Sequence, residues 1–175
     1  MTDDATPTHD PLEQHETPLE HRAHRLAGAI YGTILATTVV ATAGHDPETV
    51  NRSLALVAGT SVVFWLAHSY SLMVAARLVV RRPITVREAA GIAIAEWPML
   101  QSSWPILLAL ALGAVGVIER ETSIDVAMAV GIGALFTYGY IMGRQEGQPH
   151  ARRFLNAAVT GGFGLAILAL KVLVH

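Results

Sequence analysis

Five long apolar runs, separated by short charged turns, constrain this chain more than any other feature of its sequence. They lie at about 26–43, 54–80, 89–118, 124–143 and 154–174. Runs of this length match the ~30 Å hydrocarbon core of a bilayer better than the interior of a soluble domain. Only 15% of the residues are charged, whereas a soluble domain carries about 25%. The sequence therefore predicts an all-α fold, a polytopic integral membrane helix bundle with about five transmembrane helices.

Residues 1–20 differ from the rest of the chain because they are polar and acidic, contain three prolines and lack apolar periodicity. Such a segment cannot bury enough apolar surface to fold. We therefore expect a disordered cytoplasmic tail, followed by a single transmembrane domain at 21–175. The tail ends in Thr17-Pro18-Leu19-Glu20, a capping box with proline at the first helical position, so a helix can begin there. The histidines in and near the tail are expected to be solvated: His9, His15, His21 and His24.

The first apolar run admits a second interpretation. Two arginines precede it and Ala41-Thr42-Ala43 ends it, as in a secretory signal with a small-residue cleavage site. The long acidic stretch ahead of the arginines argues against cleavage. We therefore expect this run to remain in the chain as a span. Its glycines at positions 28 and 32 have the four-residue spacing that allows close helix approach.

The third apolar run, 89–118, contains two prolines and follows a helix-start signal. Thr85-Val86-Arg87-Glu88 is a capping box, so a helix is expected to begin at about Thr85. Pro98 and Pro105 each remove a backbone hydrogen bond inside the run. The sequence therefore predicts either a kinked span or an interfacial helix followed by a span. A similar signal at 122–125 is expected to cap the fourth span.

The distribution of basic residues predicts the orientation of the spans. In a five-span arrangement, nine of the twelve basic residues fall on one side, most of them in the turns at 77–87 and 144–153. Short basic loops remain on the cytoplasmic side of a membrane. We therefore expect the N-terminus inside and the C-terminus outside, with the bacterial inner (cytoplasmic) membrane as the location.

Two of the apolar runs carry one ionisable residue each, His68 in the second and Glu96 in the third. An ionisable side chain at membrane depth is costly and is a functional-site hypothesis by default. The two runs are consecutive, so a contact between His68 and Glu96, direct or through water, is geometrically possible. Imidazole titrates near neutral pH, which suits a proton path. The simpler interpretations are a histidine that hydrogen-bonds a neighbouring helix and a glutamate solvated at the membrane interface.

A polar pocket around this pair would recruit neighbouring side chains. The carbonyls freed by the two prolines would add acceptors, because irregular backbone at membrane depth is tolerated where it lines a cavity. The hypothetical substrate or proton path then comprises His68, Glu96, Tyr70, Gln101 and Ser103, with helix kinks at Pro98 and Pro105.

The absence of recognisable motifs limits the functional classes. The chain has no cysteine, nucleotide-binding loop, zinc signature or nucleophile motif, so we expect no catalytic residue, metal or cofactor, and an enzyme is the less favoured class. The favoured hypothesis is a small transporter or channel-like component with a polar site at His68 and Glu96. The alternative is a structural or accessory subunit of a membrane complex. Expected partners are the lipid bilayer and further copies or subunits, not nucleic acid.

Overall fold

The computed structural model describes residues 18–42 and 49–174, and every regular element in these two ranges is a helix. The helices are α1 (Pro18–Ala41), α2 (Thr49–Val80), α3 (Val86–Ala95), α4 (Trp97–Gln101), α5 (Trp104–Ala114), α6 (Arg120–Gln145) and α7 (His150–Val174). Within the described ranges, α2, α6 and α7 are long and apolar enough to cross a membrane. The predicted all-α class is confirmed, and three such helices are compatible with a membrane location.

Several predicted helix ends can be compared with the structure. Helix α1 begins at Pro18, the position that the first capping box indicates, and the tail before it lies outside the described residues. The predicted cap of the fourth run is wrong, because α6 begins at Arg120 with Glu119 as its N-cap residue. A favourable capping sequence inside a longer apolar helix can be overridden, because packing of that helix contributes more than one cap.

The third apolar run is not one kinked helix but three short ones. Breaks at Glu96 and at Ser102-Ser103 separate α3, α4 and α5. Pro98 and Pro105 lie in the first turn of α4 and α5, where the missing backbone N–H has no helical acceptor to lose. The two prolines therefore start new helices instead of kinking an existing one. Helix α5 has 11 residues, about 16 Å of helix against a hydrocarbon core of ~30 Å.

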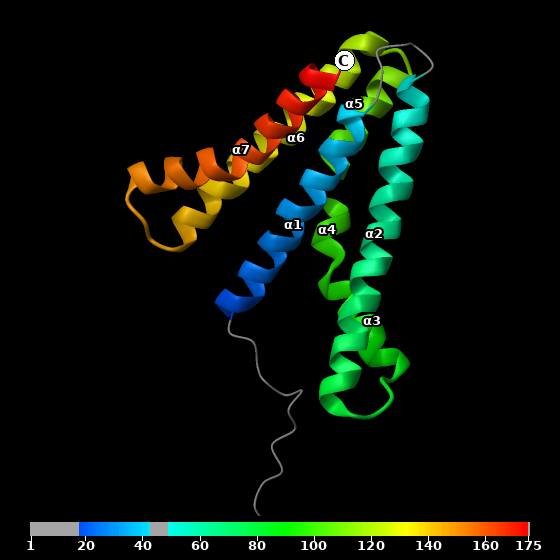
Figure 1. The fold of residues 1–175 in the computed structure, drawn as a ribbon, viewed down its shortest axis with the longest axis vertical. Helices are drawn as coiled ribbons and strands as arrows, with labels where there is room; N and C mark the ends of the chain where they lie inside the picture. Colours follow the sequence, from blue (N-terminus) through cyan, green and yellow to red (C-terminus); the bar gives the residue numbers. More distant parts are fainter. Residues whose placement is uncertain (1–17, 43–48, 175) are drawn as a thin grey trace, which may run out of the picture.

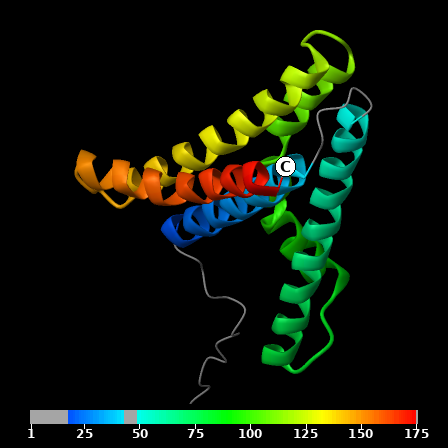
Figure 2. The same ribbon diagram turned by 45° about the horizontal axis from the view of Figure 1, so that its top comes forward.

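The helices diverge from one end of the molecule. Figure 1 shows α6 and α7 as an antiparallel hairpin that leans away from α2, with α1 between them. Helix α4 lies between α1 and α2, and α3 runs beside the last turns of α2. After the rotation in Figure 2, α1 lies alongside the hairpin while α2 remains apart from it. We call the end where α1, α2, α5 and α6 meet the closed end. We call the opposite end, where α1, α2 and the α6–α7 hairpin diverge, the open end.

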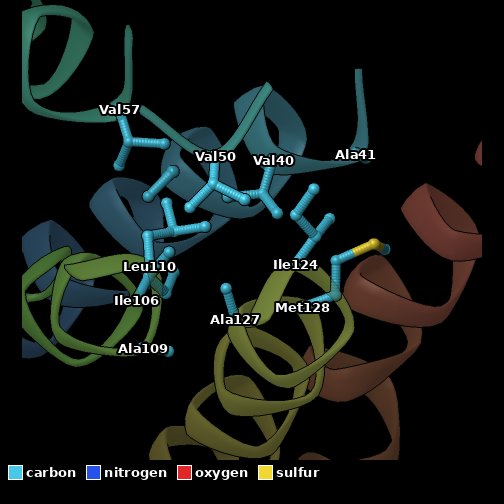
Figure 3. Packing of buried hydrophobic residues seen from close by; sticks show 11 residues of the cluster. Val40, Ala41, Val50, Val57, Ile106, Ala109, Leu110, Ile124, Ala127 and Met128 are labelled. Carbon is cyan, nitrogen blue, oxygen red and sulfur yellow. The ribbon is translucent and has the colours of Figure 1, made fainter. Parts of the chain in front are cut away.

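The closed end holds the apolar core (Figure 3). Its side chains come from the end of α1, the start of α2, α5 and the first half of α6. The largest of its fully buried side chains are Val40, Val50, Val57, Ile106, Leu110 and Ile124. Close-packed aliphatic groups of this kind hold helices together through many small dispersion contacts. The core therefore fixes one end of α1 and α2 and leaves their other halves to be held by different contacts.

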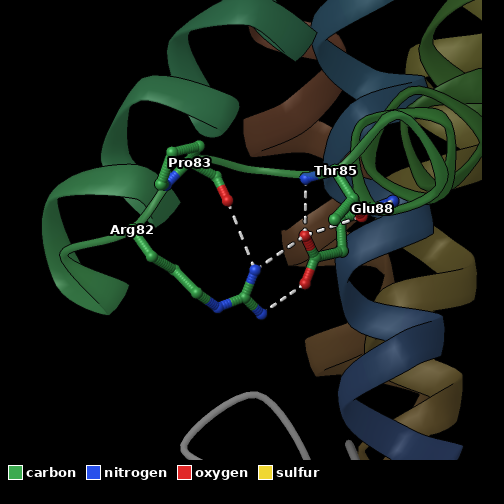
Figure 4. Close-up of polar contacts among 4 residues, drawn as sticks. All are labelled: Arg82, Pro83, Thr85 and Glu88. Atoms are coloured by element: carbon green, nitrogen blue, oxygen red, sulfur yellow. Dashed lines mark hydrogen bonds and ion pairs between the residues drawn. The ribbon is translucent and has the colours of Figure 1, made fainter.

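The turn from α2 into α3 is closed by the capping box predicted from sequence, which is confirmed (Figure 4). The Thr85 hydroxyl accepts a hydrogen bond from the Glu88 backbone, and the Glu88 carboxylate accepts from the Thr85 backbone N–H at 2.7 Å. Arg82 donates to both carboxylate oxygens, at 2.6 and 3.2 Å. These bonds, those from Arg82 first and those from Thr85 next, lower the pKa of the Glu88 carboxyl to about 2. Helix α3 thus starts at a fixed place beside α2.

Candidate functional site

Glu96 is the centre of the site because its buried carboxylate lies between two histidines. It occupies the break between α3 and α4, and only 2% of its surface is exposed. Its Oε1 lies 2.5 Å from His24 Nε2, and its Oε2 lies 3.4 Å from His68 Nε2. His24 belongs to α1 and His68 to α2. The Glu96 carboxylate therefore connects α1, α2 and the break between α3 and α4, at the end of the molecule away from the apolar core.

Close approach of α1 and α4 brings His24 to Glu96. A Cβ atom added at Gly32 would lie 2.1 Å from the Met99 carbonyl oxygen, so α1 and α4 touch backbone to backbone at this glycine. One turn earlier, a Cβ atom at Gly28 would lie 3.9 Å from Glu96 Oε2, an ordinary contact distance. The small-residue spacing noted in the sequence therefore serves packing within the chain, and it sets how near His24 can come to Glu96.

The indole of Trp65 holds α3 against α2. Its Nε1 donates a hydrogen bond to the Ala93 carbonyl at 3.0 Å. The same ring meets Trp97 edge to face, with centroids 5.8 Å apart and an interplanar angle of 87°, a favoured aromatic geometry. Residues 93 and 97 flank the helix break, so Trp65 fixes the position of Glu96 relative to His68, which lies one turn further along α2.

The Glu96 carboxylate is buried, whereas the two histidines beside it are partly exposed. The side chain of His24 is 44% exposed and that of His68 is 40% exposed, whereas the Glu96 side chain is 2% exposed. The His68 ring also lies 6.1 Å from the Tyr31 ring, centroid to centroid. A proton that reaches or leaves Glu96 therefore has an exposed imidazole available on either side of it.

The chemistry of this arrangement follows from the two nitrogens of imidazole. Both histidines place Nε2 near Glu96: the His24 ring is hydrogen-bonded to the carboxylate, and the His68 ring lies at ion-pair distance from it. Within the described residues, Nδ1 of neither ring has a hydrogen-bond partner in the protein. A ring that gains a proton at Nδ1 can release one from Nε2, which is how histidine shuttles protons. The site can therefore bind a proton and pass it between α1 and α2.

The buried hydroxyl of Ser69 indicates that water or a ligand group can reach this part of α2. Its hydroxyl is buried and has no hydrogen-bond partner in the part of the chain that the structure describes. Buried hydroxyls are normally satisfied, so an unpaired one indicates a water or a ligand group. Ser69 directly follows His68 on α2, so this unsatisfied group lies in the same helical turn as the histidine but on an adjacent face of the helix.

The remaining residues predicted for the site lie elsewhere. Tyr70 is 68% exposed and lines a separate hollow at the end of α2. Gln101 is exposed and faces a hollow between α1, α4 and α6. Ser103 is buried, and its hydroxyl donates to the Leu100 carbonyl at 2.8 Å. In the described ranges, none of the three hydrogen-bonds the Glu96 carboxylate.

The prediction for His24 is wrong, because this histidine is not a solvated tail residue but the nearest partner of Glu96. The misleading features were the acidic segment before it and the apparent start of the span at residue 26. A better signal was present in the sequence: with a helix beginning at Pro18, His24, Gly28 and Tyr31 lie on one face at 3/4 spacing. The solvated interpretation of Glu96 also does not hold, because this side chain is buried.

Comparison with other proteins provides no further information on the site. No family model, no curated protein and no solved structure matches the chain. In the described residues, no group of three histidine, cysteine or acidic side chains is placed to hold a metal ion. The functional argument therefore rests on the geometry of Glu96 and its two histidines.

Proposed function

We propose that this chain is a small membrane transporter or channel-like component that carries protons, alone or coupled to a solute, through Glu96. The observation that carries the proposal is the placement of one buried carboxylate between two half-exposed histidines from different helices. Here both partners are imidazoles, a side chain that proton relays in membrane proteins use.

The order of the groups suggests a path. His24 lies six residues from the first residue of α1, about 9 Å along the helix, whereas His68 lies twelve residues from the end of α2, about 18 Å. A proton taken up at His24 would pass to Glu96 and then to His68, deeper along α2. The unpaired Ser69 hydroxyl next to His68 would hold a water that continues the path.

A membrane location is supported by the side chains that the fold leaves uncovered. Large apolar residues are exposed along α2 and α7, among them Val63, Leu66, Leu78, Val79, Leu155, Val159, Val172 and Leu173. A monomeric soluble protein rarely exposes so much contiguous apolar surface. We propose an inner (cytoplasmic) membrane of a bacterium, with about five membrane-embedded segments and the N-terminus inside, because nine of twelve basic residues then lie in the cytoplasm.

The same exposed surface supports assembly with other copies or subunits. Helix α2 packs only part of its length against its neighbours, and α5 is too short to cross a bilayer alone. A single copy offers little room for a solute pathway. We therefore propose that the conducting unit is a homo-oligomer or part of a larger membrane complex, with the lipid bilayer around it.

The alternative proposal is a structural or accessory subunit in which Glu96 only joins helices. It is favoured by the observation that the carboxylate connects α1, α2 and the α3–α4 break, which tight packing at Gly32 also holds together. Under this alternative, the hydrogen bond between His24 and Glu96 contributes about 0.6–2 kcal/mol, and proton exchange at the site has no functional consequence.

Proton flux into liposomes separates the two proposals. The purified chain would be reconstituted with a pH-sensitive dye inside and a potassium diffusion potential as the driving force. We expect flux that is lost in Glu96→Gln and in His68→Ala, while His150→Ala, which changes an exposed histidine at the start of α7, remains as active as the parent. Equal flux in parent and Glu96→Gln, both correctly folded, would refute the proton-carrying proposal and leave the structural one.

A further inference from the structure

A polar hollow between α1, α4 and α6 is separate from the Glu96 carboxylate and has a lining suited to anions. Its volume is about 320 Å³, within the range of small-ligand sites. The polar lining residues come from three helices: Arg22 and Arg25 from α1, Gln101 and Ser102 at the end of α4, and Tyr138 and Gln145 from α6. Among the residues that the structure describes, no acidic side chain lines it.

The two arginines are available to a ligand. Within the described residues, neither Arg22 nor Arg25 has an ion-pair partner. Arg82 at the α2–α3 turn is different, because its guanidinium is engaged by the Glu88 carboxylate. A guanidinium presents a planar fork of N–H donors that matches the oxygens of a phosphate. Two unpaired forks one turn apart on α1 can therefore hold one anionic group between them.

The uncharged lining residues indicate that the arginines of this hollow do more than determine the orientation of a membrane span. Arginines that only orient a span need no partners from other helices. Here α4 and α6 add two amide side chains and a phenol, whose donors can bind oxygens that the arginines leave free. A hollow with cationic and neutral donors and no carboxylate selects negative charge.

We propose that this hollow is a binding site for a phosphate group, carried either by a lipid headgroup or by a free phosphate anion. The site lies where the α6–α7 hairpin diverges from α1 (Figure 1), so a bound phosphate joins the hairpin to α1 and α4 across the open end. This assignment does not depend on proton conduction at Glu96, although both sites share α1 and α4.

The test measures binding by the full chain from two sources of phosphate. In neutral detergent, thermal unfolding is followed as inorganic phosphate replaces chloride at constant ionic strength. In parallel, the chain is unfolded in nanodiscs of phosphatidylcholine with and without phosphatidylglycerol. A saturable rise in unfolding temperature with inorganic phosphate supports a free-anion site. A rise only with phosphatidylglycerol supports a headgroup site. No rise from either source would overturn the proposal.

Two double variants locate the effect. Arg22→Gln/Arg25→Gln should weaken the response at least about tenfold, while Arg87→Gln/Arg152→Gln, which removes the same charge outside the hollow, should respond as the parent does. Equal responses of the two double variants would refute the site. If the first one fails to fold, Arg25→Lys decides: it keeps the charge and loses the fork, so an unchanged response overturns the proposal. Glu96→Gln should bind phosphate normally, which separates this result from that of the flux experiment.

Discussion

Glu88 and Glu96 lie eight residues apart at the start and the end of α3, and their different partners give them different roles. Glu88 is partly exposed, accepts two hydrogen bonds from Arg82 and closes a capping box. Glu96 is buried and faces His24 and His68. Arginine remains charged at every physiological pH, whereas histidine changes charge near neutrality. A carboxylate fixed by arginine therefore serves the fold, whereas one between histidines suits the proton exchange that we propose for Glu96.

Replacing a histidine partner of Glu96 with an arginine should produce the largest effect on proton flux. In His24→Arg, the buried carboxylate gains a permanent cation, so we expect proton flux to fall at least about tenfold, equivalent to ~1.4 kcal/mol of barrier. The folded state should remain, because a charge-assisted bond replaces the histidine contact. Liposome flux and thermal unfolding of the same preparations would measure both effects.

The reciprocal exchange is the control for this prediction. Arg82→His gives Glu88 a titratable partner at the exposed turn, far along α3 from the break, and should leave flux unchanged. If His24→Arg conducts as the parent does, the identity of the partner does not determine the role of Glu96, and the contrast between the two glutamates fails.

The second prediction concerns the packing that brings His24 to Glu96. Gly32→Ala places a Cβ against the Met99 carbonyl oxygen, at 2.1 Å before any shift, so α1 has to move away from α4. Overpacking of this kind costs about 1–3 kcal/mol. We expect a lower unfolding temperature and reduced flux from the same variant. Gly28→Ala is the matched control, since its Cβ finds ordinary contact distances, and a similar loss in both variants would contradict the assigned packing.

How far the sequence predicts this site depends on the kind of signal. The capping box at Thr85 is local, so it predicts the start of α3 correctly. The nearness of His68 and Glu96 follows from consecutive helices joined by a short turn. Hydrogen-bond chemistry alone favours Tyr70 and Gln101, but both face other hollows. Tyr70 lies two residues after His68 and therefore on another face of α2, and Gln101 lies at the end of α4, beyond the break at Glu96. His24 was missed because its contact spans 72 positions and depends on backbone contact at Gly32.

A smaller effect is expected from the hydrogen bond that joins α2 to α3. Trp65→Phe removes the indole N–H that binds the Ala93 carbonyl and retains an aromatic ring beside Trp97. Loss of one such hydrogen bond costs about 0.5–1.5 kcal/mol. We expect a modest fall in unfolding temperature and a shift in the pH dependence of flux, because Glu96 is then held less firmly near His68. Trp104→Phe, at an exposed indole on α5, is the control and should change neither quantity.

The smallest expected effect is the pH dependence of the turn at Glu88. Its hydrogen bonds with Arg82 and Thr85 lower the pKa of this carboxyl from 4.5 to about 2. A carboxyl whose pKa is lower in the folded state stabilises the fold above its unfolded pKa, and that contribution is lost as the pH falls. We therefore expect the parent to be slightly more stable than Glu88→Gln above pH 4.5, and the difference to vanish as the pH falls toward 2. Because the turn is exposed, salt should reduce the difference. Thermal unfolding of both proteins across this pH range measures it, and a difference that persists unchanged at pH 2 would show that the cap does not depend on the charge of Glu88.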